Sequence, residues 1–199
     1  MKKEFLPYTT VRNNALKLAH RIAADGFVPD VIYVSLRGGA YIGNVISEYF
    51  KVLRKDRHPV FYAAVVARSY LDINRKDKVH VDGWTYDPEY LRHGDRILLL
   101  DDIFDSGMTV NYLVGILIEK GIPRSDIKVA VHDYKQRIYS REQLPIQPDY
   151  YCRFHAIEKP AEDFWIHYLS HELVGLTPEE KQQHYLEDDS ELYDVFDKI

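Results

Sequence analysis

Three aspartates, a serine, a glycine and a threonine lie close together in the middle of the chain. They belong to the stretch Asp101 to Thr109, which reads DDIFDSGMT. Hydroxyls and the backbone N–H groups at a helix start suit a phosphate, which the helix dipole also attracts. Neighbouring carboxylates suit the vicinal hydroxyls of a sugar, or a hard cation such as Mg²⁺. The order of the groups therefore predicts a sugar phosphate site, with the phosphate at Asp105 to Thr109 and the sugar at Asp101 and Asp102.

The elements on either side of this stretch would place it at the edge of a parallel sheet. The four aliphatic residues Ile97 to Leu100 are typical of a strand buried on both faces. Apolar residues at helical spacing run from Val110 to Ile118, and Lys120-Gly121 would end that helix. Open α/β sheets bind their ligands at the carboxyl ends of their strands, which is where Asp101 and Asp102 would lie.

A second strand, loop and helix earlier in the chain follow the same logic. Val31 to Val34 is a short buried-strand pattern, and a helical pattern runs from Ala40 to Phe50. Between them, Arg37 offers a fixed charge suited to phosphate oxygens, and the glycines Gly38 and Gly39 let backbone amides approach an anion. Alternatively, such glycines only pack a helix closely onto a strand.

An apolar strand followed by Asp-Asp-x-x-Asp-Ser-Gly-x-Thr resembles the signature of the type I phosphoribosyltransferases. A generic strand, acidic turn and capped helix would explain the apolar run, but not three aspartates with Ser-Gly-x-Thr at this spacing. The resemblance implies a cis peptide bond at Leu36-Arg37, a base at Asp105 that takes a proton from purine N7, and a catalytic role for Arg37. It implies that phosphoribosyl pyrophosphate is bound by Leu36, Arg37, Gly38, Ser69, Tyr70, Asp101, Asp102, Asp105, Ser106, Gly107, Met108 and Thr109.

Later residues resemble the purine-binding part of the 6-oxopurine members of that family. Lys135, after a strand from Ile127 to His132, stands where a lysine would donate to the carbonyl oxygen at position 6. In the stretch Asp-Phe-Trp-Ile, Trp165 would stack on the purine and the backbone of Ile166 would contact its edge. The alternatives are a solvated surface lysine and a core aromatic residue.

The resemblance also implies Mg²⁺ as cofactor, held by Asp101 and Asp102. Relatives place an aspartate a few residues after the aromatic residue, where it helps to hold a second Mg²⁺. Here the corresponding region reads Tyr168-Leu169-Ser170-His171-Glu172, so Glu172 is the candidate metal ligand.

The stretch from Leu71 to His93 is polar and shows little periodicity, and we expect it to form a long loop. It is either a surface hairpin insertion or the loop that closes over the active site in this family, next to the Ser69-Tyr70 pair. Closure would exclude water from an oxocarbenium-like transition state.

The remaining patterns complete an α/β fold. A helix is expected from Thr9 or Thr10 to Ile22, and strands at Val60 to Ala67 and Tyr150 to Phe154. Strands that alternate with helices predict a parallel twisted sheet flanked by helices. The resemblance implies that this sheet belongs to a Rossmann-like type I phosphoribosyltransferase fold with a small hood lobe. We expect a single domain over residues 1–199. Its hood would comprise about 134–175 and the N-terminal segment, and 177–199 would form an acidic C-terminal extension.

Composition and net charge limit the classes of partner and the cellular location that we expect. The net charge of −5 argues against nucleic acid or an acidic membrane surface as a partner. The one cysteine, Cys152, excludes an internal disulfide and fits a reducing compartment. We see no signal peptide or transmembrane span and expect a cytoplasmic protein. The resemblance implies a homo-oligomer, a dimer or tetramer.

The first functional hypothesis is a purine salvage enzyme, a pentosyltransferase. It would make a nucleoside monophosphate and pyrophosphate from phosphoribosyl pyrophosphate and guanine, xanthine or hypoxanthine. The second is a non-catalytic regulatory protein of the same fold that binds phosphoribosyl pyrophosphate or a nucleotide as a signal. A weaker third is the same reaction on another base, such as a pyrimidine.

Overall fold

A computed structural model describes residues 2–54, 58–70, 78–140 and 144–198; for residues 68–70 and 78 it describes the backbone alone. The chain divides into two compact units. The large unit comprises Thr9–Asp163, and the small unit comprises Met1–Tyr8 and Phe164–Ile199. The prediction of a single domain with a hood is not tested by this division.

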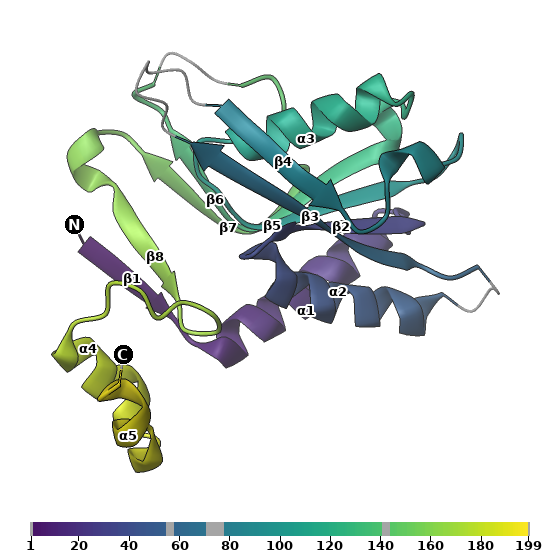
Figure 1. Cartoon of the computed structure of the whole chain (residues 1–199). Helices are drawn as coiled ribbons and strands as arrows, with labels where there is room; N and C mark the ends of the chain where they lie inside the picture. The colour runs from purple at the N-terminus through teal and green to yellow at the C-terminus, as the bar shows by residue number, and fades with distance from the viewer. Residues whose placement is uncertain (1, 55–57, 71–77, 141–143, 199) are drawn as a thin grey trace. The chain divides into compact units, whose positions relative to one another are not determined.

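The large unit is built on a six-stranded sheet whose strand order is β4-β3-β2-β5-β6-β7 (Figure 1). Its pairs are parallel except for β4, which pairs antiparallel with β3. Helices α1 and α2 cover one face and α3 covers the other. The predicted α/β sheet is therefore confirmed, apart from its antiparallel edge. The elements are β2 (Val31–Leu36), β3 (Phe61–Tyr70), β4 (Lys78–Trp84), β5 (Ile97–Phe104), β6 (Ile127–Arg137), β7 (Tyr150–Ile157), α1 (Tyr8–Ala24), α2 (Gly39–Leu53) and α3 (Met108–Glu119).

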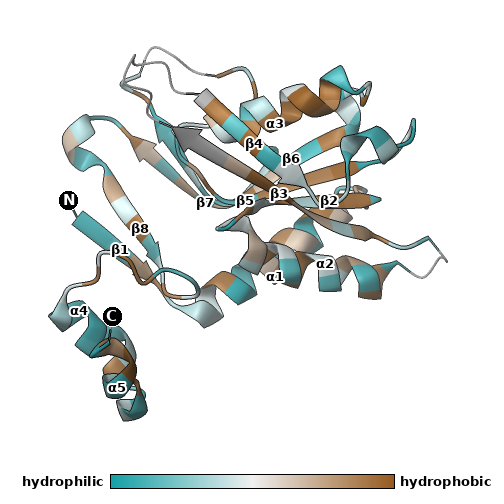
Figure 2. Cartoon of the chain, viewed as in Figure 1, coloured by the Kyte–Doolittle hydropathy of each residue, from teal (hydrophilic) through white to brown (hydrophobic). Residues whose placement is uncertain are grey.

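The central strands are buried on both faces, as their aliphatic runs predicted. Alternate residues of β2, β5 and β6 pack with the apolar face of α3, which includes Leu113 and Leu117. The intervening residues, such as Ile32 and Leu98, are also fully buried. Figure 2 shows this concentration of hydrophobic residues in the sheet. The strand ends that carry the candidate residues thus start from a rigid core.

Two of the glycines in α2 serve close packing. A Cβ on Gly43 would lie 2.1 Å from Cγ1 of Val34, and one on Gly39 would lie 2.8 Å from the carbonyl oxygen of Leu100. The packing alternative therefore holds for Gly39, and Gly43 packs closely in the same way. Gly38 is different, because it faces a side chain of the candidate site.

The expectation of an unpatterned loop from Leu71 to His93 is wrong for its later part, where β4 pairs antiparallel with β3 as the hairpin alternative expected. β4 occupies Lys78–Trp84 and a short 3-10 turn occupies Pro88–Tyr90. The alternation of apolar and polar residues in VHV was hidden among the surrounding charges, and Val81 packs against the core. The pairing with β3 shifts register between Val66 and Ala67, so Trp84, three residues after Val81, also packs against the core. Residues 71–77 lie outside the described part of the chain.

The small unit pairs the first strand of the chain with a late one. β1 (Lys2–Leu6) and β8 (Phe164–Tyr168) form a parallel pair with Lys2 opposite Phe164 and Leu6 opposite Tyr168. A capping box at Thr177 begins the short helix α4 (Pro178–Lys181).

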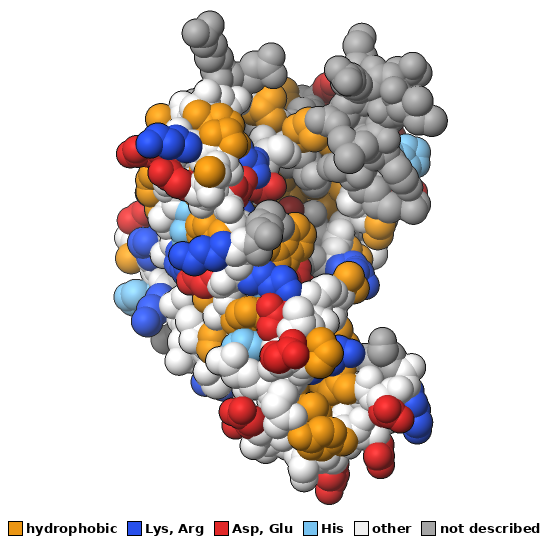
Figure 3. Space-filling model, turned by 90° about the vertical axis from the view of Figure 1, so that its left-hand side faces the viewer, with side chains coloured by type: hydrophobic (Ala, Val, Ile, Leu, Met, Phe, Trp, Pro, Cys, Tyr) orange, Lys and Arg blue, Asp and Glu red, His pale blue; other side chains and the backbone are white. Residues whose placement is uncertain are grey.

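The C-terminal segment packs back on β1 within the small unit. Lys3 forms an ion pair with Glu180 at 2.7 Å, and the ring of Phe5 stacks on His184 at 4.1 Å. Beyond it lies α5 (Tyr193–Phe196). Figure 3 shows acidic side chains among exposed hydrophobic ones in this segment. Glu187 to Asp189 are exposed, as predicted for the acidic extension.

Among the described residues, no helix combines the length and apolarity that a membrane crossing requires.

Candidate functional site

The predicted sugar phosphate residues line one pocket of about 200 Å³ in the large unit. The pocket lies where β5 ends and α3 begins, so the acidic residues come from a buried strand and the hydroxyl residues from a helix start. Its lining includes Asp101, Asp102, Asp105, Ser106, Gly107 and Thr109. Met108 is the first residue of α3. The structure thus brings together the groups that sequence spacing predicted for this site.

The two neighbouring carboxylates are held by their own backbone. The N–H of Asp102 donates to Oδ1 of Asp101 at 3.0 Å, and the N–H of Ile103 donates to Oδ1 of Asp102 at 2.8 Å. Burial and the adjacent charge of Asp102 raise the pKa of Asp101 well above its usual value, and a hydrogen bond from Ser35 offsets part of this rise. Hydroxyl donors or a cation bound at this pair would relieve the unfavourable charge.

That electrostatic situation fits the predicted Mg²⁺. Two adjacent carboxylates with few protein ligands around them are a usual site for Mg²⁺ that also binds substrate oxygens and water. The described residues contain no group of three or more His, Cys, Asp or Glu side chains arranged to hold a metal alone. Asp101 and Asp102 would hold the ion together with the substrate.

Gly38 brings the second predicted loop against this carboxylate pair. A Cβ on Gly38 would lie 2.1 Å from Oδ2 of Asp102, so the carboxylate occupies the space that a side chain would need. The preceding Leu36-Arg37 peptide bond is cis, as the resemblance implied. Leu36 ends β2, and Arg37 is exposed beside the loop. The loop from Leu36 to Gly38 therefore borders the site.

The turn before α3 depends on a left-handed glycine. Gly107 has φ +77°, and a Cβ there would lie 2.3 Å from the Phe104 ring beneath it. Ser106 Oγ accepts a hydrogen bond from the N–H of Met108 at 3.4 Å. The turn is also held by Asn111, a residue that the sequence analysis did not identify. Its side-chain amide donates to the carbonyl oxygens of Gly107 and Ile146 at 3.0 and 2.9 Å.

Replacing Gly107 with alanine should destabilise the fold more than the same change at Gly121. Both glycines have positive φ, at +77° and +91°, so both variants pay about 1–2 kcal/mol of backbone strain. An alanine at position 121 meets nothing within 4 Å, whereas one at 107 collides with the Phe104 ring, adding roughly 1–3 kcal/mol. Urea unfolding of both variants measures the difference in their free energies of unfolding. Equal losses of stability in the two variants would contradict the collision with Phe104.

A second pocket of about 270 Å³ adjoins the first and shares Phe104, Asp105 and Ser106 with it. Lys135 and Arg137 from the end of β6 also line it. The Lys135 side chain is 5% exposed, so the surface-lysine alternative is wrong. This pocket places a cation beside the predicted phosphate loop.

The charged residues of the second pocket are joined by ion pairs. Lys135 Nζ donates to Asp163 Oδ1 at 2.9 Å, and Arg137 Nη2 donates to Asp163 Oδ2 at 2.9 Å. Arg137 Nη2 also donates to Oδ1 of Asp105 at 2.6 Å. Burial would raise the pKa of Asp163, but its bonds to Lys135 and Arg137 outweigh burial and lower it. Arg137 is not among the residues predicted from the sequence. Its position two residues after Lys135 on the same strand, and so on the same face, is the signal that could have identified it.

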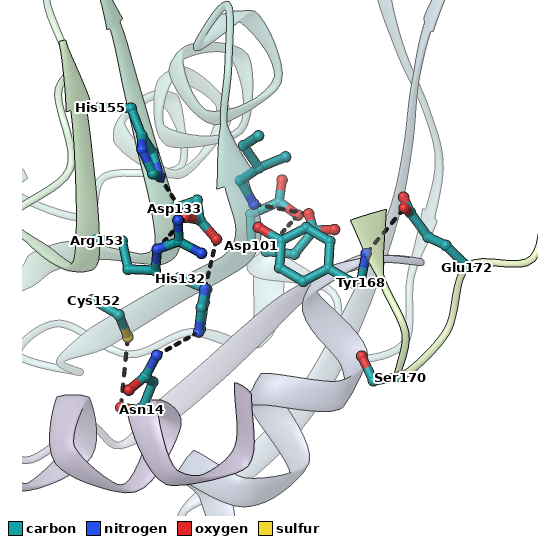
Figure 4. A network of polar contacts seen from close by, with 12 residues as sticks. Asn14, Asp101, His132, Asp133, Cys152, Arg153, His155, Tyr168, Ser170 and Glu172 are labelled. Carbon is teal, nitrogen blue, oxygen red and sulfur yellow. Dashed lines mark hydrogen bonds and ion pairs between the residues drawn. The ribbon is translucent and has the colours of Figure 1, made fainter. Parts of the chain in front are cut away.

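A buried polar network between α1, β6 and β7 supports the end of β6 (Figure 4). Asp133 is fully buried and accepts hydrogen bonds from His132 Nδ1 and His155 Nε2, both at 2.6 Å. Arg153 Nε lies 3.4 Å from Asp133 Oδ1, and Asn14 of α1 donates to His132 Nε2 at 3.2 Å. The network links α1, β6 and β7, and so fixes the strand end that carries Lys135 and Arg137.

The remaining predicted residues of the small unit form a group of their own. Trp165 is 48% exposed, so the core-aromatic alternative is wrong, whereas Ile166 is buried. Glu172 accepts hydrogen bonds from Trp165 Nε1 at 3.4 Å and from the N–H of Tyr168 at 3.2 Å. Their assignments to the purine and to a second Mg²⁺ stay predictions.

Ser69 and Tyr70 end β3, and their side chains lie outside the described part of the chain.

Known structures share this arrangement of strands and helices. A purine phosphoribosyltransferase from Pyrococcus horikoshii is 20% identical and superposes with a TM-score of 0.66 over 89% of this chain and 99% of its own. A xanthine-guanine-hypoxanthine phosphoribosyltransferase from Helicobacter pylori is 16% identical, with a TM-score of 0.56 over 84% of this chain and 91% of its own. The chain has the phosphoribosyltransferase fold. Within this fold, the first pocket is formed by the end of β5, the acidic pair Asp101 and Asp102, and the start of α3.

A third similar structure is a hypothetical protein from Neisseria gonorrhoeae with bound ppGpp. It is 18% identical, with a TM-score of 0.64 over 87% of this chain and 91% of its own. No family model matches the chain, and no curated protein matches it by sequence. At these identities the likeness establishes the fold, and the reaction must be argued from the site residues.

Proposed function

We propose that the chain is a purine phosphoribosyltransferase. It would transfer the phosphoribosyl group of phosphoribosyl pyrophosphate to a 6-oxopurine, giving a nucleoside monophosphate and pyrophosphate. The observation that carries the proposal is the pair of adjoining pockets. One combines two carboxylates with a Ser-Gly-x-Thr helix start, and the other presents Lys135. The shared fold of purine phosphoribosyltransferases supports it.

In the first pocket, Ser106 to Thr109 would bind the 5′-phosphate through hydroxyls and the amides at the start of α3. Asp101 and Asp102 would accept hydrogen bonds from the ribose hydroxyls, and the loop from Leu36 to Gly38 would hold the pyrophosphate. When bound, Mg²⁺ would neutralise the charge of the leaving pyrophosphate.

In the second pocket, Lys135 would donate to the carbonyl oxygen at position 6 of the base. An adenine would present an amino group there, which cannot accept this hydrogen bond. As the bond from the sugar to pyrophosphate breaks and the bond to the base nitrogen forms, Asp105 would accept the proton that the base loses from N7. Its negative charge would also stabilise the positive charge that develops on the ribose.

The test is turnover of guanine, hypoxanthine, xanthine, adenine and uracil by the purified chain with phosphoribosyl pyrophosphate and Mg²⁺. We expect nucleotide and pyrophosphate from at least one 6-oxopurine, and a kcat/KM for adenine at least about 100-fold lower, because Lys135 would be left without an acceptor. Faster turnover of adenine or uracil would contradict the assignment of the base.

A second candidate function is the binding of a nucleotide as a signal without turnover. It is favoured by the bound ppGpp in the neighbour from Neisseria gonorrhoeae. Calorimetric titration separates the two functions. Tight nucleotide binding in a chain that converts none of the five bases would favour the signalling role.

A further inference from the structure

We infer that Arg137 is a positioning residue that acts through Asp105. It would hold the carboxylate of Asp105 in the orientation that accepts the proton of the base, while Asp163 holds Arg137. The inference rests on the proposed function, because it concerns the same site and the same proton.

The geometry of the guanidinium carries the inference. Nη2 of Arg137 is 2.6 Å from Oδ1 of Asp105 and 2.9 Å from Oδ2 of Asp163, and Nε is 3.2 Å from that same Oδ2. The planar, rigid guanidinium thus bridges two carboxylates, a contact that the compact ammonium of a lysine makes less well.

The burial of these groups shows which of them is held in place by the others. The Asp105 side chain is 47% exposed and lies on the turn before α3, whereas Arg137 is 25% and Asp163 21% exposed. Asp163 also receives a hydrogen bond from Lys135, which is 5% exposed. Lys135 and Asp163 are therefore the fixed end of the network. Arg137, held by Asp163, restricts the orientation of the more exposed Asp105.

The contact leaves Asp105 suited to its proposed role. Arg137 donates to Oδ1, so Oδ2 is the oxygen directed to the base in this proposal. The charges of the four groups also cancel, because Lys135 and Arg137 are cations and Asp105 and Asp163 are anions. A neutral purine therefore binds beside two cations without an excess of positive charge.

An isolated surface ion pair would matter little, and this possibility sets the controls. Arg124 offers the matched pair, since its guanidinium lies 3.3 Å from Asp149 Oδ2 near the opposite end of β6. Arg124 lies in the 3-10 turn just before β6, so Arg124→Gln removes the same kind of contact without touching either pocket.

The experiment is a double-mutant cycle of Arg137→Gln and Asp105→Asn, with Arg137→Lys and Arg124→Gln alongside. We expect Arg137→Gln to lower kcat by about 100-fold, with the KM for phosphoribosyl pyrophosphate changed by no more than about twofold. The kcat of the double variant should lie within about threefold of that of Asp105→Asn alone, because Arg137 acts only through Asp105. The kcat of Arg137→Lys should fall by about tenfold, and that of Arg124→Gln by less than about twofold.

Each other outcome overturns the inference. Multiplicative losses in the cycle would mean that Arg137 acts independently of Asp105. A raised KM with unchanged kcat would mean that Arg137 binds substrate directly. An equal loss in Arg124→Gln, with lowered thermal stability in both, would assign the effect to the fold. A parent chain that turns over no base would remove the proposed function as well, whereas an active parent with multiplicative losses removes the inference alone.

Discussion

Replacing Asp105 with asparagine should lower kcat by about 10²–10⁴-fold, the usual contribution of a general base. Asparagine has nearly the same shape, and its carbonyl oxygen still accepts the hydrogen bond that Arg137 now donates to Oδ1. It cannot take a proton from N7 of the base, nor stabilise positive charge on the ribose. The measurement is steady-state turnover of the preferred oxopurine, with the KM for phosphoribosyl pyrophosphate followed in parallel.

Asp188→Asn is the control for this change, because it removes the same charge from an exposed position in the C-terminal segment. It should turn over like the parent. If Asp105→Asn is as fast as the parent, Asp105 is not the base. If it raises the KM for phosphoribosyl pyrophosphate with kcat intact, its carboxylate acts only in binding the sugar phosphate.

The second large effect is expected from Gly38→Ala. The added methyl group would occupy the space of the Asp102 carboxylate, 2.1 Å from Oδ2, so Asp102 must turn away from its present position. Gly38 has φ −59° and ψ −43°, which alanine adopts without strain. We therefore expect kcat/KM for phosphoribosyl pyrophosphate to fall by about 10–100-fold, since small displacements in a preorganised site are costly. The free energy of unfolding should change by less than about 1 kcal/mol.

Gly115→Ala is the matched control for Gly38→Ala. Gly115 lies within α3, and a Cβ there would meet nothing within 4 Å. That variant should keep its activity and gain about 0.5–1 kcal/mol of stability, because alanine loses less backbone entropy than glycine in a helix. A kcat/KM for phosphoribosyl pyrophosphate equal to that of the parent in Gly38→Ala would contradict the predicted displacement of Asp102.

The parts of the fold that sequence predicts well are those with strong local signals. The aliphatic run before Asp101 predicts a buried strand, and β5 begins at Ile97 as expected. The left-handed Gly121 ends the following helix, because its φ of +91° is costly for other residues. The first pocket follows from these two elements, since all its residues lie in or between them.

The parts that sequence does not predict depend on contacts between distant segments. β1 carries charged residues at three of its five positions, and its pairing with β8 is visible only in the fold. The ion pair between Arg137 and Asp105 joins residues 32 positions apart on separate elements, and no local pattern marks it. Asp163 begins the Asp-Phe-Trp-Ile stretch, but its contact with Lys135 depends on where the chain returns after β7. These are tertiary interactions, which local propensity does not encode.

The pairing of β1 with β8 affects the order in which the two sheets can form while the protein is synthesised. The large unit is one continuous segment, Thr9–Asp163, whereas the small unit is assembled from residues on either side of it. On a ribosome, β1 has no strand partner until Phe164–Tyr168 has emerged, because those residues pair with it. All the strands of the sheet that carries both pockets precede β8 in the chain, so that sheet can form before β1 is paired.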